Sequence, residues 1–412
     1  MRQQRLWLGT LLILIIGATG SMPQGHAPIA SRWNYNEHLF PILRDRCGRC
    51  HNEGGVAPMS LLTYEDAYPW AQSIREEVLG MRMPPWLAED GFGDFKNGHV
   101  LAAHEMDMIL EWASGGYPRG NRALTPPVPE FDSDWMLGEP AAIIELKEPY
   151  AIDAETNETV RYFVLPAGTS EDKWVTAIDF KPGARAVVRG AALFVDTEGT
   201  ARALDDGIAG VGFSEADRRD FPTSPPLALW IPGQDPISTN GMGFRLPAAA
   251  DVVLRIHYKK TWITEGEAFS DKSRVGLYFG AGDFAKIESV VFASAAELSG
   301  REVAFTHVLD REVTLVALLP EVEIEAEEMQ VEAVKPDGSR VPMLWLREPS
   351  TGWPTRFWFD SPVTLPGGTR LEVTTRLKPA AKRLTKVSLL GTDTTSPIRF
   401  LVDYVEGGAT AN

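Results

Sequence analysis

Apolar residues recur with helical spacing over much of residues 34–121. Within residues 64–80 they fall three or four positions apart, and Thr63 stands where an N-cap is expected. Residues 103–114 repeat the spacing, and Gly115-Gly116 then ends it. The pattern predicts a helical N-terminal part.

From about residue 140 onward the pattern changes to short β-rich runs separated by turn residues, which is typical of antiparallel β-sandwiches. About 270 residues are enough for two sandwiches. The predicted strands are Ala141–Leu146, Val160–Leu165, Trp174–Phe180, Ala186–Val195, Val252–Tyr258, Val275–Phe279, Glu288–Ala293, Glu312–Leu319, Met329–Val334, Met343–Leu346, Arg356–Phe359 and Arg370–Leu377. We therefore expect a helical domain over 34–121, a proline-rich linker over 122–139, a first sandwich over 140–283 and a second over 284–406.

The N-terminus has the features of an export signal. Arg2 and Arg5 precede an apolar run from Leu6 to about Gly20, and Gly25-His26-Ala27 offers a cleavage site. The run is short for a membrane span, so residues 1–27 are expected to be a signal peptide, with an N-terminal anchor helix and membrane association as the alternative. Either way, the rest of the chain is expected in the periplasm or another extracytoplasmic compartment.

Composition narrows the classes of partner and site. The net charge of −16 makes nucleic acid an improbable partner, because an acidic chain repels phosphate backbones. The chain has only two cysteines, which excludes a disulfide scaffold and a four-cysteine zinc site.

Both cysteines lie in one motif, Cys47-Gly48-Arg49-Cys50-His51. CxxCH is the attachment signal of c-type haem, so we expect one covalent haem on Cys47 and Cys50 with His51 as an axial ligand of the iron. The alternative is a redox-active dithiol, which would require a thioredoxin-like βαβ context, whereas the flanks here are predicted to be helical. Covalent haem assembly requires export, which agrees with the N-terminal signal.

Met83 is the predicted second axial ligand. It precedes Pro84-Pro85, which fix an extended loop that can present a thioether to the iron. Histidine/methionine ligation raises the reduction potential and suits an electron carrier. The alternative ligands are Met81, Met59, His99 and His104.

This region resembles class I cytochromes c, with a helix leading into CxxCH and a last helix ending at Glu111–Gly116. More narrowly, Tyr35–His38, Gly54–Met59 and Met83–Trp86 resemble cytochrome c domains that are fused to copper type II, ascorbate-dependent monooxygenase-like modules.

The β region is similar to the peptidylglycine monooxygenase-like module of such fusions. The matching segments are Leu229–Gln234, Leu254–Tyr258, Arg274–Tyr278, Met329–Ala333, Pro336–Gly338 and Leu365–Thr369. The resemblance implies a multidomain fold class, in which an all-α class I cytochrome c domain is followed by two all-β antiparallel sandwiches of jelly-roll type.

That family holds two copper ions with five histidines and one methionine, and most of these ligands are missing here. Arg189-Gly190 stand at the position of a His-His pair, and Glu321-Val322-Glu323 stand at the position of a His-x-His pair. Beyond residue 122 only His257 and His307 occur, and His257 is the only retained candidate ligand. The resemblance therefore implies that copper is not bound.

Glu321, Glu323 and Glu325 alternate along one predicted strand and share a face. We expect a solvated acidic edge, with a site for a hard cation such as Ca²⁺ as the alternative.

The sequence thus predicts an exported monohaem c-type cytochrome that mediates electron transfer, with sandwiches that dock a partner or build an assembly. Its acidic surface would steer a redox partner with a basic surface. One alternative is a haem-coupled, copper-dependent monooxygenase that hydroxylates an unknown substrate. A second is a structural haem subunit of a larger complex.

Overall fold

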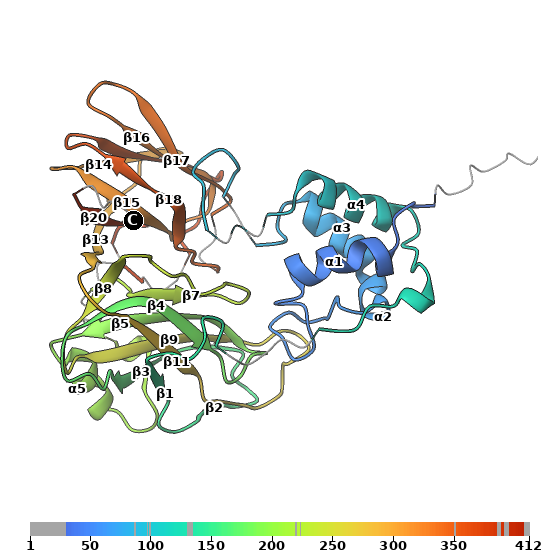
Figure 1. The fold of residues 1–412 in the computed structure, drawn as a ribbon, viewed down its shortest axis with the longest axis horizontal. Coiled ribbons are helices and arrows are strands. Elements are labelled where there is room, and N and C mark those ends of the chain that lie inside the picture. Colours follow the sequence, from blue (N-terminus) through green and yellow to red (C-terminus); the bar gives the residue numbers. More distant parts are fainter. Residues whose placement is uncertain are drawn as a thin grey trace, which may run out of the picture.

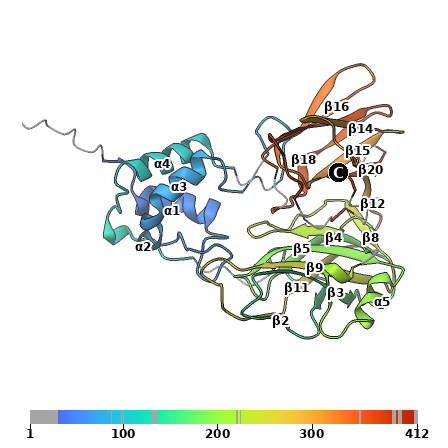
Figure 2. The same cartoon turned by 180° about the vertical axis from the view of Figure 1, so that it is seen from behind.

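Five β-sheets and a smaller group of helices make up the chain in the computed structural model (Figures 1 and 2). The structure describes residues 30–85, 88–96, 98, 100–129, 135–218, 221–222, 224–349, 352–384, 389–390 and 395–407. The predicted export segment over 1–27 lies outside this range. Among the described residues, no helix is both long enough and apolar enough to span a membrane.

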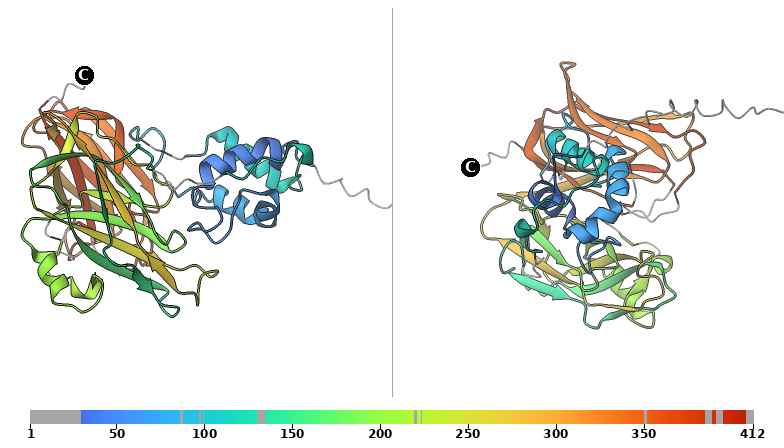
Figure 3. Two further views of the ribbon diagram at one scale, coloured as in Figure 1. Left: turned by 60° about the horizontal axis from the view of Figure 1, so that its bottom comes forward. Right: turned by 90° about the vertical axis from the view of Figure 1, so that its right-hand side faces the viewer.

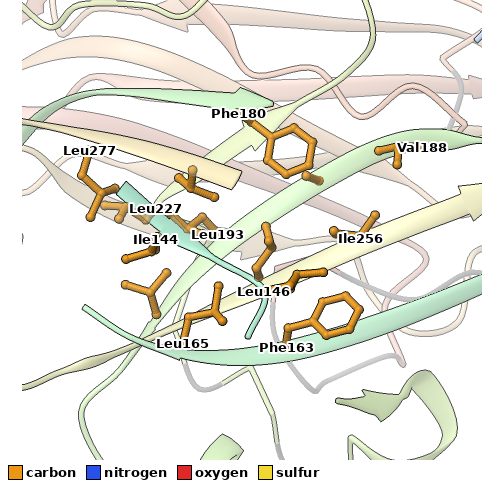
Figure 4. Close-up of a cluster of buried hydrophobic side chains, with 14 of the residues drawn as sticks. Ile144, Leu146, Phe163, Leu165, Phe180, Val188, Leu193, Leu227, Ile256 and Leu277 are labelled. Carbon is orange, nitrogen blue, oxygen red and sulfur yellow. The ribbon is translucent and has the colours of Figure 1, made fainter. Parts of the chain in front are cut away.

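The first sandwich consists of two five-stranded sheets, with the strand orders β1-β11-β4-β8-β12 and β6-β3-β9-β5-β7, and a two-stranded sheet, β10-β2. Its strands are β1 (Ala142–Glu145), β2 (Tyr150–Ile152), β3 (Glu158–Pro166), β4 (Lys173–Lys181), β5 (Val188–Asp196), β6 (Phe213–Ser214), β7 (Ala228–Trp230), β8 (Met242–Leu246), β9 (Asp251–Lys259), β10 (Phe269–Asp271), β11 (Arg274–Gly280) and β12 (Ala285–Lys286). Apolar side chains of both large sheets fill the space between them, as Figure 4 shows for Phe163, Leu193 and Leu277.

Strand β9 is apolar on both of its faces. Leu254 belongs to the core between the sheets, whereas its neighbour Val253 packs on the opposite face. There Ala201, from helix α5 (Thr200–Asp206), and Phe221 cover the strand. This explains why Val252–Leu254 form a continuous apolar run, because a strand segment buried on both faces loses the alternation of a half-exposed one.

The second sandwich packs the sheet β13-β20-β15-β18 against the sheet β14-β19-β16-β17. Its strands are β13 (Glu288–Ala293), β14 (Glu302–Val308), β15 (Val313–Val322), β16 (Ala326–Val334), β17 (Arg340–Arg347), β18 (Phe357–Leu365), β19 (Arg370–Leu377) and β20 (Ile398–Glu406). The predicted β-sandwich character of the chain is confirmed.

A buried arginine joins the two sandwiches. Arg356, just before β18, donates hydrogen bonds of 2.9 Å to the backbone oxygens of Pro226 and Leu227 in the first sandwich. Its Nε lies 2.9 Å from Oδ2 of Asp403 on β20. Phe244 of β8 packs beside Trp358 of β18 and the Arg356 guanidinium, so that apolar and charged contacts cross the same junction.

The N-terminal part contains short helices, which lie to one side of the sandwiches (Figures 1 and 3). The α-helices described over 34–121 are α1 (Phe40–Ile42), α2 (Tyr64–Ala67), α3 (Ala71–Leu79) and α4 (Ala103–Ser114). Thr63 caps α2 as predicted, because its Oγ1 accepts a hydrogen bond from the Asp66 amide at 3.1 Å. The helix predicted over 64–80 is interrupted at Pro69, which lacks the amide proton that a continuous helix needs.

The predicted fold class is wrong in its first part. The chain is predominantly β, with 38% strand and 15% helix, and the described residues contain no sizeable all-α domain of the class I cytochrome c kind. One physical reason is that part of residues 34–121 belongs to the second sandwich. Ala88 forms an antiparallel bridge with Leu346 of β17, and Phe95 forms one with Phe359 of β18.

Candidate functional site

The CxxCH motif forms a tight turn at the end of the π-helical segment Leu43–Cys47. The backbone oxygen of Cys47 accepts hydrogen bonds from the amides of Cys50 at 3.1 Å and His51 at 2.9 Å. Asn52, which is buried, donates from its side chain to the Gly48 oxygen at 2.7 Å. A Cβ at Gly48 would lie 2.7 Å from the backbone oxygen of Arg44, so this position requires glycine. The turn therefore presents the two thiols and the imidazole from one short, well-bonded loop.

The His51 ring is oriented by the backbone. Its Nδ1 lies 3.1 Å from the backbone oxygen of Met59 and donates a proton to it, because a carbonyl oxygen can only accept. Burial lowers the pKa of His51, so the ring is neutral at neutral pH. A neutral ring with Nδ1–H engaged leaves Nε2 as the free lone pair, which is the arrangement of histidines that bind metals.

Both cysteines line one pocket, whose enclosed part is about 80 Å³. Besides the motif itself, its walls include Pro84-Pro85, the loop Ile231–Gly233 that follows β7, and Arg356 at the sandwich junction. The structure thus brings the loop after Met83 close to the thiols. It also places residues 231–233 there, which the sequence did not predict.

Burial makes the two thiols poor nucleophiles. It raises the pKa of Cys47 to about 12 and that of Cys50 to about 11. A redox-active CxxC pair depends on the opposite shift, since the reactive species is the thiolate. This property disfavours a dithiol oxidoreductase.

The donor set fits a covalently attached haem. Two thiols and a neutral imidazole with a free Nε2 are the groups that such an attachment uses. Gly233, at φ +84°, approaches the motif closely, and a Cβ there would lie 3.2 Å from Cys50 Sγ. Glycine therefore keeps space open beside the thiol. The enclosed part of the pocket is small, so a macrocycle at these thiols would extend beyond it.

The predicted axial ligands differ in position. Met83 is 37% exposed and immediately precedes the two prolines that line the cysteine pocket, whereas Met81 is 51% exposed. Met59 packs against the core of the helical part and supplies its backbone oxygen to His51. His104 is exposed on α4, and His99 lies outside the described residues.

Three arginine contacts attach the motif to the first sandwich. Arg49 forms an ion pair with Asp235. Arg185 donates to the side-chain oxygen of Asn52 at 2.8 Å, and Arg189 of β5 donates to the backbone oxygen of Val56. These partners were missed from the sequence, because contacts between distant segments leave no local pattern.

His257 lies away from the motif, in a cavity between the two sandwiches that we call the central cavity. Its Nε2 is 2.8 Å from Glu158 Oε1. Arg189, Glu321 and Glu323 line the same cavity. The structure therefore brings His257 together with the positions at which the sequence analysis expected, but did not find, further histidines.

The predicted solvated acidic edge is wrong for Glu321 and Glu323. Glu323 is only 3% exposed, and both carboxylates pair with Arg399 of β20, with 2.8 Å between Arg399 Nε and Glu321 Oε2. Over the described range, no group of three His, Cys, Asp or Glu side chains is arranged to hold a metal ion.

No protein-family profile matches the chain, and no curated protein matches it. Among solved structures, the chain is similar to a peptide-N(4)-(N-acetyl-β-D-glucosaminyl)asparagine amidase, with a TM-score of 0.27 and 8% identity over 65% of this chain and 97% of that one. It is also similar to the VP2 subviral particle of infectious bursal disease virus, with a TM-score of 0.15 and 10% identity over 67% and 79% of the two chains. Likenesses of this size support no inference about function.

The predicted membership of a cytochrome c and copper monooxygenase-like fusion family is therefore wrong. No family profile and no curated relative supports it, and the described helices are too few and too short for an all-α cytochrome domain. The CxxCH motif and its geometry stand independently of that family.

Proposed function

We propose that this chain is an exported protein that carries one covalent haem on Cys47 and Cys50 and transfers electrons. The observation that supports this most strongly is the CxxCH loop itself. Its two thiols line one pocket, and its histidine is held with Nε2 free. The raised pKa of the buried thiols disfavours disulfide exchange, which requires the thiolate.

Each residue of the site would have a separate role in binding the haem. Cys47 and Cys50 would hold the haem covalently, each through a thioether made by addition of its thiol to one vinyl group, with the thiol hydrogen on the other vinyl carbon and no net oxidation. His51 Nε2 would ligate the iron, with the Met59 oxygen holding the ring in the required orientation. The haem supplies one-electron transfer when it is bound. Met83 would supply the second ligand of the iron, since the loop that follows it borders the cysteine pocket.

The redox partner is proposed to have a basic surface. A wide groove of about 1260 Å³ runs beside the loop that follows His51. Of the charged side chains that line it, four are acidic (Glu53, Glu65, Asp66 and Glu267) and one is basic (Arg185). With a net charge of −16 for the whole chain, this groove would steer a basic protein toward the haem. The sandwiches would serve to dock this partner or to build an assembly.

The test is to produce the full chain, with its export segment, in a bacterium that assembles covalent haem. We expect a mass increase of one haem that survives denaturation, iron without stoichiometric copper, and fast reduction by a soluble electron donor. The Cys47→Ser/Cys50→Ser double variant should lose the covalent haem, whereas His104→Ala should keep it, because His104 is exposed on α4.

Three outcomes would contradict the proposal. A chain that stays free of haem under these conditions has no covalent haem site. Bound copper with ascorbate-dependent oxygen consumption would indicate a monooxygenase. A haem that is attached but cannot exchange electrons would indicate a structural role.

A further inference from the structure

The central cavity is a second site with the properties of a ligand pocket. It is separate from the cysteine pocket and lies between the outer face of the β3, β5 and β9 sheet and the end of β15. Its volume is about 370 Å³, which lies within the range of small-molecule sites. Pockets of this kind occur preferentially at interfaces between domains.

Part of the cavity wall is apolar. Val160 and Leu229 contribute from the first sandwich, and Leu319 and Leu390 contribute from the second. These side chains would contact the apolar body of a ligand, since burying apolar surface is the main favourable term in binding.

The acidic side chains of the wall are already paired. Glu158 contacts Lys259 at 3.0 Å and His257 at 2.8 Å. Burial opposes the ionisation of Glu158, but these two contacts outweigh burial and lower its pKa. Glu321 and Glu323 both pair with Arg399. The carboxylates of the cavity therefore have cationic partners already.

Two arginines of the wall have weaker contacts with carboxylates than Lys259 and Arg399 have. Arg189 lines the cavity and donates to two backbone oxygens, those of Val56 and of Lys259 at 3.1 Å, and among the described residues it forms no ion pair with a carboxylate. Arg255 Nε is buried without a hydrogen-bond partner among the described residues. Its nearest ion-pair contact is at 4.0 Å, to Oε2 of Glu215, a carboxylate that also pairs with Arg218 at 2.5 Å.

We propose that the central cavity binds a small organic carboxylate with an apolar body, whose carboxylate lies against Arg189 and Arg255. A guanidinium presents two parallel N–H donors that match a carboxylate, and a partly buried cation whose nearest anion is distant or shared is stabilised by acquiring a closer one. The cavity shares no lining residue with the cysteine pocket, so this proposal rests on different residues from those of the proposed haem site.

The test uses calorimetric titration of the full chain with matched acids and amides, hexanoate with hexanamide and benzoate with benzamide. At least one acid should bind with a Kd of about 1 mM or tighter, and its amide should bind at least about tenfold more weakly. Arg189→Gln should weaken binding of the acid by about 10- to 100-fold, and Arg255→Gln should also weaken it. Val160→Phe should abolish binding by filling the cavity, with the thermal unfolding of each variant measured alongside.

Arg185→Gln is the matched control, because Arg185 also reaches the CxxCH loop but does not line this cavity. It should leave binding of the acid unchanged. The proposal is overturned if neither acid binds, if the amides bind as well as the acids, or if Arg185→Gln weakens binding as much as Arg189→Gln does.

Discussion

The guanidinium Nε of Arg356 lies 2.9 Å from Oδ2 of Asp403, and both side chains are almost completely excluded from solvent. Burial lowers the pKa of Arg356 and raises that of Asp403, so each charge depends on the other. Because Arg356 also binds the backbone oxygens of Pro226 and Leu227, the pair forms part of the junction between the sandwiches.

Replacing Arg356 with methionine should lower the free energy of unfolding by about 3–5 kcal/mol, because Asp403 would then be a buried charge without its partner. Urea denaturation followed by fluorescence measures the change. The control is Arg370→Met, which breaks a half-exposed pair with Glu372 and should cost about 1 kcal/mol or less. Equal losses in the free energy of unfolding would show that the buried pair stabilises the fold no more than the half-exposed pair does.

The contact between Arg49 and Asp235 should determine how firmly the CxxCH loop is held on the first sandwich. Asp235→Asn is expected to increase amide hydrogen exchange in residues 47–57 by roughly fivefold, which corresponds to about 1 kcal/mol for a half-exposed pair. Asp172→Asn breaks an exposed pair with Arg245 and should leave these amides unchanged. Unchanged exchange in Asp235→Asn would mean that the Arg185 and Arg189 contacts hold the loop without it.

If haem is bound as proposed, Met83→Ala should alter the absorption spectrum of the oxidised protein and lower its reduction potential, because thioether ligation raises the potential. Absorption spectroscopy detects the loss of the methionine–iron band, and a redox titration measures the potential. Met81→Ala is the matched control from the same loop. A Met83→Ala protein that kept the band would assign the ligand to another side chain.

Glu215 should make stability depend on pH. Burial raises its pKa above the ordinary value of 4.5, although Arg218, Arg255 and Tyr162 act in the opposite direction. Between these two pKa values the folded chain binds more protons than the unfolded chain, so the contribution of Glu215 to stability falls as pH rises through this interval.

The measurement is the free energy of unfolding of the wild type relative to Glu215→Gln, from about pH 4 to about pH 7. The wild type should lose stability relative to the variant as pH rises. Glu158→Gln is the control of opposite sign, because the pKa of Glu158 is lowered and its contribution is lost as pH falls. A flat difference for Glu215→Gln would contradict the assignment.

Strand positions were the part of the fold that local pattern predicted best. The runs Glu288–Ala293 and Arg370–Leu377 are the observed β13 and β19. Along β19 buried side chains alternate with more exposed ones, and this leaves a period of two in the sequence. The helical part was predicted less well. Residues 88–96 bridge β17 and β18, whose positions in the sequence are remote, and no local period encodes such a partner.

In the candidate site, too, the sequence predicts the local features but not the contacts between distant segments. The motif alone identifies Cys47, Cys50 and His51 as chemically special, since their spacing is the signal. Their surroundings depend on tertiary contacts, and so does the burial of Glu323. The alternation that places Glu323 on a strand face is the same whether that face meets water or Arg399, so the sequence could not distinguish the two.

The walls of the cysteine pocket impose an order of events on the maturation of the protein. Pro84-Pro85, Ile231–Gly233 and Arg356 line the pocket that holds the thiols, and the last two are synthesised long after Cys47. Any enzyme that modifies these thiols therefore has the best access to the motif before the C-terminal part of the chain has folded. Folding of the sandwiches then closes the pocket, so the thiols of Cys47 and Cys50 are most accessible to chemical modification before the sandwiches fold.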